Sequence, residues 1–150
     1  WDHQTMALPN EEVFYLSPDR KRVTRVTEDL KKPNGITGTP DGKHLYVSDI
    51  RAGQTWRYDI QPDGSLTNKM FFCALGSDGM TIDTEGNLYL TGHVVTIFDQ
   101  DGKQIDHIDV NEKWCGNVSF GGQDHQTLFI TASTGLYSIQ TRMKGANAAK

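Results

Sequence analysis

The chain has 150 residues, of which 36% are hydrophobic, and its formal net charge is −4. A chain of this length ordinarily forms one globular domain, and no apolar run approaches the roughly 18 residues that a membrane span needs. The negative charge, with no basic cluster larger than Arg20-Lys21-Arg22, argues against a nucleic-acid-binding surface.

Short strands separated by turns are expected from the first part of the chain onwards. Val13–Leu16 and Arg22–Val26 are predicted strands, and the turn sequence Ser17-Pro18-Asp19-Arg20 joins them. No helical pattern of useful length follows anywhere in the chain. The composition therefore favours an all-β protein.

The rest of the chain repeats one pattern three times: a strand, a tight turn and a returning strand. Counted between the equivalent residues Gly35, Gly79 and Asn117, the steps are about 44 and 38 residues, which is typical of a β-propeller in which each repeat is one blade. We predict an all-β fold, a partial β-propeller domain over residues 1–150 with roughly three four-stranded blades. Its expected units are a strand pair in 11–30, complete blades in 34–73 and 78–110, and an incomplete blade in 116–140.

Blade geometry predicts which residues meet at one mouth of the central channel. The innermost strand of each blade starts at this mouth, and the second strand returns to it. The strand starts place Asn34, Asp78 and Gly116 at equivalent positions. The ends of the second strands, or the loops beside them, add the other candidates for this mouth: Asp49, Gly92, Ser133, His93 and Trp114.

Asn34 and Asp78 are candidate metal ligands. An amide oxygen and a carboxylate are hard donors that suit Ca²⁺, Mg²⁺ or Mn²⁺. The competing interpretation is that Asn34-Gly35 and Asp78-Gly79 are ordinary turn dipeptides that lead into a strand. Spacing alone favours the turn interpretation.

Several separated motifs carry a family resemblance: Lys32–Gly35 with Pro40–Asp49, Ser77–Met80, Phe120–Gly122 with Leu128–Ser133, and Leu136–Ile139. In this order and spacing, over about Val13 to Gly145, the chain resembles the gluconolactonase, senescence-marker-protein and luciferin-regenerating-enzyme family. The resemblance implies a six-bladed propeller that hydrolyses sugar lactones, such as gluconolactone, with a divalent metal in the channel. Ca²⁺ is the favoured metal, with Mg²⁺, Mn²⁺ and Zn²⁺ as alternatives.

The same resemblance implies roles for individual residues. Asn34 and Asp78 are expected to bind the metal, and Asp78 is expected to be catalytic because it helps to activate the attacking water. Blade geometry, and not the resemblance, makes His93, Asp49 and Trp114 the candidates for meeting the substrate at the mouth. The family's glutamate ligand and its substrate-binding Arg and Asn belong to a first blade that this chain lacks, so the chain resembles the C-terminal half of a lactonase.

A different class of function stays open, because a propeller fragment without chemistry can serve as a binding or assembly platform. Propellers need about four to eight blades to close, so we expect these 150 residues to associate. The partner is either a missing N-terminal half or a second copy related by a two-fold axis. No signal peptide is recognisable, and the compartment stays open between cytoplasm and periplasm.

Aromatic residues at alternating strand positions, Tyr46, Trp56, Tyr89 and Phe129, are predicted to pack between the blades. The two cysteines, Cys73 and Cys115, have a spacing that suits no metal motif, and buried free thiols are expected.

Overall fold

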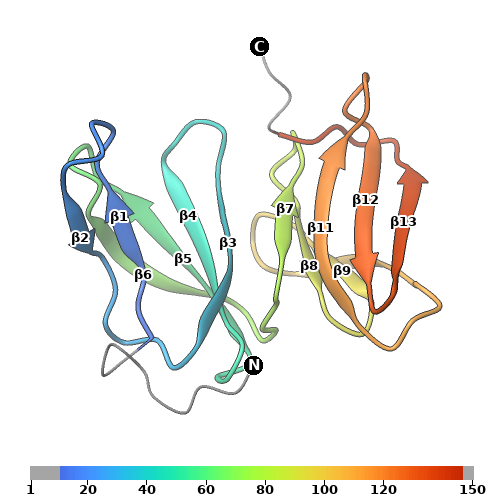
Figure 1. The fold of residues 1–150 in the computed structure, drawn as a ribbon, viewed down its shortest axis with the longest axis horizontal. Coiled ribbons are helices and arrows are strands. Elements are labelled where there is room, and N and C mark those ends of the chain that lie inside the picture. The colour runs from blue at the N-terminus through green and yellow to red at the C-terminus, as the bar shows by residue number, and fades with distance from the viewer. Residues whose placement is uncertain (1–10, 147–150) are drawn as a thin grey trace.

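The computed structural model describes residues 11–146, which form thirteen strands and no helix (Figure 1). No helix in this part of the chain is long and apolar enough to cross a membrane. The strands form antiparallel sheets in which each strand pairs with its neighbours in sequence. The sheets comprise, in order, β1 (Phe14–Leu16) and β2 (Val23–Arg25); β3 (Pro33–Gly38), β4 (His44–Asp49), β5 (Gln54–Ile60) and β6 (Leu66–Cys73); β7 (Met80–Ile82), β8 (Leu88–Thr91), β9 (Val95–Phe98) and β10 (Gln104–Ile108); and β11 (Cys115–Gly121), β12 (Thr127–Ala132) and β13 (Gly135–Gln140).

The last three sheets are arranged side by side, so that their first strands, β3, β7 and β11, lie next to one another (Figure 1). β3 contacts β7, and β7 contacts β11. Short strands with an alternating apolar pattern bury one or both faces only when further sheets cover them, which is the packing of propeller blades. The prediction of an all-β, partial β-propeller is confirmed.

The register of the three inner hairpins shows which residues are equivalent. In each hairpin, a hydroxyl residue of the first strand faces an aromatic residue of the second: Thr37↔Tyr46, Thr81↔Tyr89 and Ser119↔Phe129. Counting back from these pairs places Asn34, Asp78 and Gly116 at matching positions. The pairing register of each hairpin is fixed, because a shift of one residue would turn the buried face of the strand to water.

Edge-to-face contacts between aromatic rings help to hold the second and third sheets together. The Tyr46 and Phe72 ring centroids lie 4.9 Å apart, and Phe72 meets Phe98 at 6.2 Å, both edge to face. The apolar side chains of Ile82 and Leu88 are almost completely buried beside them. Each such ring removes a large apolar area from water and adds about 0.5–1.5 kcal/mol from its edge contact.

Tyr89 continues the pattern at the next seam, where it packs on Phe120 with ring centroids 5.1 Å apart. The prediction of a packing role is therefore confirmed for Tyr46 and Tyr89. It is wrong for Phe129, which is 39% exposed because, within residues 11–146, no further sheet covers its face of β12. Trp56 is only half-buried and packs on Phe71.

The cysteine expectation is confirmed, because Cys73 and Cys115 are both buried and free. Burial raises the pKa of the Cys73 thiol to about 11, so this thiol stays neutral and behaves as a small apolar side chain.

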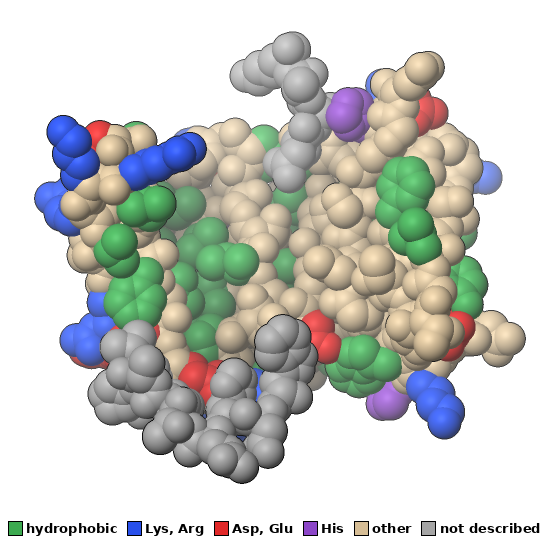
Figure 2. Space-filling model, viewed as in Figure 1, with side chains coloured by type: hydrophobic (Ala, Val, Ile, Leu, Met, Phe, Trp, Pro, Cys, Tyr) green, Lys and Arg blue, Asp and Glu red, His purple; other side chains and the backbone are tan. Residues whose placement is uncertain are grey.

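Large apolar side chains are exposed on the sheets at the two ends of the described chain. Val23 and Leu16 are 66% and 51% exposed on the first sheet, and Leu136 is 71% exposed on the last. Figure 2 shows hydrophobic side chains on the surface over both end regions. Sheet faces of this kind, next to open strand edges, favour association with further strands or sheets.

We predict from these end faces that the chain associates in solution. Light scattering should give a mass above the 16.8 kDa of one chain, with about twice that value for a two-copy ring. A Val23→Asp, Leu136→Asp double variant should lower the mass, because both side chains are exposed and their replacement leaves the core intact. A wild-type chain that stays at 16.8 kDa and unfolds cooperatively would contradict the prediction.

Candidate active site

Asn34 and Asp78 are in direct contact where two neighbouring inner strands begin. Asn34 is the second residue of β3, and Asp78 lies two residues before β7. The Asn34 amide Nδ2 donates to the Asp78 Oδ1 at 2.8 Å. The contact joins residues 44 positions apart in sequence, as the repeat alignment predicts for adjacent blades.

The glycine after each of these residues makes the contact possible. A Cβ built on Gly35 would lie 2.8 Å from the Ser77 carbonyl oxygen, and one on Gly79 would lie 2.8 Å from the Asn117 Cα. The Gly35 N–H donates to the Ser77 carbonyl oxygen at 3.0 Å across the seam between the sheets. Neither glycine has a positive φ, so both serve close strand approach and not a tight turn.

The second oxygen of Asp78 is held from the other side. The Trp114 indole Nε1–H donates to the Asp78 Oδ2 at 2.6 Å, while the indole itself is 41% exposed. The carboxylate therefore lies between an amide donor and an indole donor, at a position that is partly open to solvent. Hydrogen bonds at both oxygens hold the carboxylate in a fixed orientation.

His93 supports the indole from the side. The two rings meet edge to face, with centroids 5.2 Å apart and planes at 84°. His93 Nδ1 lies 3.1 Å from the Lys113 carbonyl oxygen, and because a carbonyl only accepts, Nδ1 is the donor. His93 Nε2 is then left for solvent or a ligand. The structure thus brings the two predicted metal ligands, Asn34 and Asp78, into one cluster with two of the residues expected beside them, Trp114 and His93.

Buried hydroxyl groups fix the segment that carries Asp78, and sequence reasoning missed them. The Ser77 Oγ donates to the Gly79 carbonyl oxygen at 2.6 Å, and the Gly79 N–H donates to the Thr91 Oγ1 at 3.0 Å. On the other side, the Thr55 Oγ1 donates to the Leu75 carbonyl oxygen at 2.7 Å. Ser77, Thr91 and Thr55 are almost completely buried, so these bonds satisfy polar groups that would otherwise be costly to bury.

Comparison with known proteins agrees with this arrangement. The family described as the SMP-30/Gluconolactonase/LRE-like region matches residues 2–134. The chain belongs to this family. A gluconolactonase of Zymomonas mobilis is 34% identical over 148 residues, which is 89% of this chain and 41% of that protein.

Solved structures of the family share the fold. A gluconolactonase structure from Xanthomonas campestris is 30% identical, with a TM-score of 0.81 over 89% of this chain and 46% of that one. A regucalcin from Agrobacterium tumefaciens, described as a calcium-binding protein, is 22% identical, with a TM-score of 0.79 over 89% of this chain and 53% of that one. The chain spans about half the length of the lactonases that it matches.

The donor set fits part of a cation site. Asn34 and Asp78 offer an amide and a carboxylate, which are the ligands that hard divalent cations prefer. Ca²⁺ takes about 6–8 oxygen ligands, so these two side chains are a fraction of a complete shell. Among the residues that the structure describes, no three His, Cys, Asp or Glu side chains gather as a metal-binding group.

Asp49 lies apart from this cluster. It is 2% exposed, and its carboxylate accepts the backbone N–H groups of Lys31 at 2.6 Å, Lys32 at 2.9 Å and Ala52 at 3.1 Å. Burial would raise the pKa of the Asp49 carboxyl, but the backbone donors, Lys31 first, outweigh it and lower the pKa. Its oxygens are occupied in tying the segment before β3 to the end of β4.

Replacing Gly79 should damage the site through the backbone. Gly79→Ala places a Cβ against the Asn117 backbone, and we expect a loss of about 1–3 kcal/mol of unfolding free energy, as for an overpacked core. Denaturant unfolding measures this, with Gly38→Ala as the matched control, because its Cβ would meet its first neighbour at 3.6 Å. Equal stability of the two variants would show that the strands at Gly79 have room to move.

Asp49→Asn should lower stability at neutral pH by about 1–3 kcal/mol, because buried backbone donors lose a charged acceptor. A carboxyl whose folded pKa is lowered stabilises the protein above its unfolded pKa of about 3.9 and loses that effect as the pH falls through the folded pKa. The difference between wild type and variant should therefore shrink when unfolding is measured at pH 3 and below. A difference that is constant between pH 7 and the acid range would contradict this role.

Proposed function

We propose that the chain supplies the Asp78 half of a metal-dependent sugar-lactone hydrolase. The contact of Asp78 with both Asn34 and Trp114, at the mouth where the inner strands begin, is the observation that supports this proposal most. It gives an oriented, partly exposed carboxylate with an amide beside it, in a family whose named relatives include gluconolactonases.

The chemistry requires a water molecule, a base and a means of stabilising negative charge on the lactone carbonyl. The water oxygen bonds to the carbonyl carbon, and the ring C–O ester bond breaks. Asp78 accepts the proton of the water and returns it to the ring oxygen that leaves, so the product is an open-chain hydroxy acid. No atom beyond the lactone and one water is consumed.

Each neighbour of Asp78 has a part in this proposal. Trp114 and Asn34 hold the carboxylate at both oxygens, which fixes its direction toward the mouth. A divalent cation, when bound by Asn34 and Asp78 with further oxygen ligands, supplies polarisation of the carbonyl and a lower pKa of bound water. We propose Ca²⁺ as the first metal to test; two hard oxygen donors suit Mg²⁺ and Mn²⁺ as well, so these ions and Zn²⁺ are to be compared. His93 borders the same mouth and is proposed to meet the substrate.

A binding platform without chemistry is the second candidate. The exposed apolar end faces favour it, because they offer surface for assembly that needs no cation. A binding platform does not explain the contact between Asn34 and Asp78. The two candidate functions also predict different results when the Asp78 carboxylate is removed: a hydrolase loses activity, and a platform is unaffected.

Asp78→Asn should lower the rate of gluconolactone hydrolysis by about 10²–10⁴-fold, because the only charged group of the Asn34–Asp78 pair is lost. Asn34→Ala removes a neutral donor and should weaken Ca²⁺ binding and activity by about 10–100-fold. Hydrolysis is followed by acid release in the association state that light scattering identifies, and Ca²⁺ affinity is measured separately by calorimetry.

Asp101→Asn is the control, since Asp101 is an exposed aspartate in the turn between β9 and β10. Unchanged hydrolysis and unchanged Ca²⁺ affinity in Asp78→Asn would refute the proposed function and leave the platform.

A further inference from the structure

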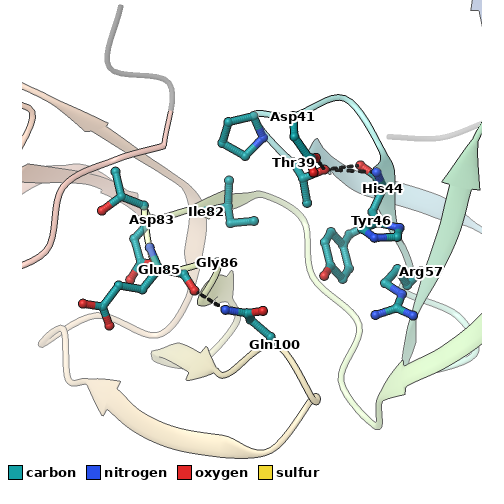
Figure 3. Close-up of a pocket in the computed structure, with 12 residues that line it drawn as sticks. Thr39, Asp41, His44, Tyr46, Arg57, Ile82, Asp83, Glu85, Gly86 and Gln100 are labelled. Carbon is teal, nitrogen blue, oxygen red and sulfur yellow. Dashed lines mark hydrogen bonds between the residues drawn. The ribbon is translucent and has the colours of Figure 1, made fainter. Parts of the chain in front are cut away.

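A second pocket lies at the opposite end of the seam between the second and third sheets. It has a volume of about 410 Å³ and is bordered by the β3–β4 turn at Thr39–Asp41 and the β7–β8 turn at Asp83–Gly86 (Figure 3). These turns are at the far ends of β3 and β7 from Asn34 and Asp78, so the pocket is separate from the candidate active site. Its size is in the range of pockets that hold small organic ligands.

One wall carries a cation that lacks an acidic partner. Arg57 on β5 is half-buried, and among residues 11–146 its guanidinium makes no ion pair with a carboxylate. Its Nη2 contacts the Met70 sulfur, a weak acceptor, at 3.2 Å, and its charge also acts on the Tyr46 hydroxyl and the Asp59 carboxylate nearby. A guanidinium has five N–H donors, so most of its capacity is left for the pocket that it lines.

Tyr46 places a hydroxyl beside this cation. Tyr46 and Arg57 face each other directly across β4 and β5, so both side chains project from the same face of the sheet. The Tyr46 ring is 3% exposed and packs on Phe72, while Figure 3 shows its hydroxyl pointing into the pocket. Burial raises the pKa of Tyr46, with Arg57 opposing in part, so the hydroxyl remains a donor. Arg57 and Tyr46 together form a donor corner that suits a carboxylate.

The other wall offers acceptors and an apolar floor. The Gln100 Nε2 donates to the Glu85 carbonyl oxygen at 2.6 Å, which fixes the amide and leaves the Gln100 Oε1 free to accept. Ile82 lies between the two walls (Figure 3). An amide oxygen next to an apolar surface suits the hydroxyl groups and carbon chain of a polyol.

The acidic residues around the pocket are satisfied or directed away. The Asp83 carboxylate accepts the Glu85 and Asn87 N–H groups, both at 2.9 Å. Asp41 accepts the Thr39 hydroxyl and the Lys43 N–H, which hold the pKa of its carboxyl at about 2. The Glu85 carboxylate points away from the pocket in Figure 3. Arg57 is therefore a charged lining residue that, within residues 11–146, forms no ion pair.

We propose that this pocket binds a small hydroxylated carboxylate, with its carboxylate on Arg57 and Tyr46 and its hydroxyl groups on Gln100. The choice of gluconate as probe rests on the proposed function, because opening a sugar lactone releases an acid of this type. A product held here is well away from Asp78, so the pocket is a second ligand site on the same blade pair.

The test is calorimetric titration of gluconate into the wild-type chain and three variants. Arg57→Gln should weaken binding at least about tenfold, and Arg57→Lys should weaken it less, because charge is kept while the two-pronged contact is lost. Arg142→Gln, at an exposed arginine outside the pocket, should bind as the wild type does. Sorbitol, a neutral polyol of the same length, should give no measurable heat.

Asp78→Asn separates this proposal from the proposed function. Gluconate binding that persists in Asp78→Asn and is lost in Arg57→Gln supports the second site, whether or not the chain hydrolyses lactones. Binding that is lost in Asp78→Asn and kept in Arg57→Gln places gluconate at the channel mouth and overturns the proposal, as does the absence of binding to the wild type. If Arg57→Gln does not fold by circular dichroism, Arg57→Lys decides the question, since wild-type affinity in that variant would also overturn it.

Discussion

The close approach of neighbouring inner strands is the constraint on which the rest of this structure depends. At Gly35 and at Gly79 the space that a side chain would need is already filled by the adjacent strand. The hydrogen bond from the Gly35 N–H to the Ser77 carbonyl oxygen then ties two sheets through their backbones. Because the strands meet this closely, the residues before the glycines, Asn34 and Asp78, have side chains within hydrogen-bond distance.

Where two sheets approach this closely, water is excluded, and the buried polar groups of the backbone need hydrogen-bond partners within the protein. The segment that leads into β7 does so with hydroxyl side chains from both adjoining sheets, Thr55 on one side and Thr91 on the other. Buried networks of this kind stabilise a unique arrangement only when every member has a partner. Here they leave the Asp78 carboxylate, two residues before β7, as the polar group directed to the mouth. A carboxylate held by a segment bonded in this way needs little reorganisation for the role proposed for Asp78.

The repeat pattern was sufficient to predict the fold class and the equivalence of Asn34 and Asp78, because both follow from strand period and spacing. The partner of each side chain was harder to predict. Asp49 ends a strand at the expected mouth, yet its carboxylate is occupied by backbone N–H groups that no spacing indicates. Phe129 alternates like a core residue, and its exposure depends on whether another sheet covers β12. The pocket at Arg57 needed the cross-strand register with Tyr46 and the position of a turn from the next sheet, both of which are properties of the packed structure.

The packed interface between the second and third sheets therefore determines the geometry at both of its ends. The aromatic side chains of Tyr46, Phe72 and Phe98 interlock at edge-to-face angles, so the second and third sheets cannot slide past each other without breaking these contacts. Toward one end, this fixed alignment brings Asn34 against Asp78. Toward the other, it sets the distance between Arg57 and the turn that carries Glu85. Tyr46 belongs to both features, since its ring packs in the seam and its hydroxyl lines the pocket. A ligand bound at the Arg57 end would accordingly contact the same packed core that positions the Asp78 carboxylate, so the two proposed sites would share one structural support.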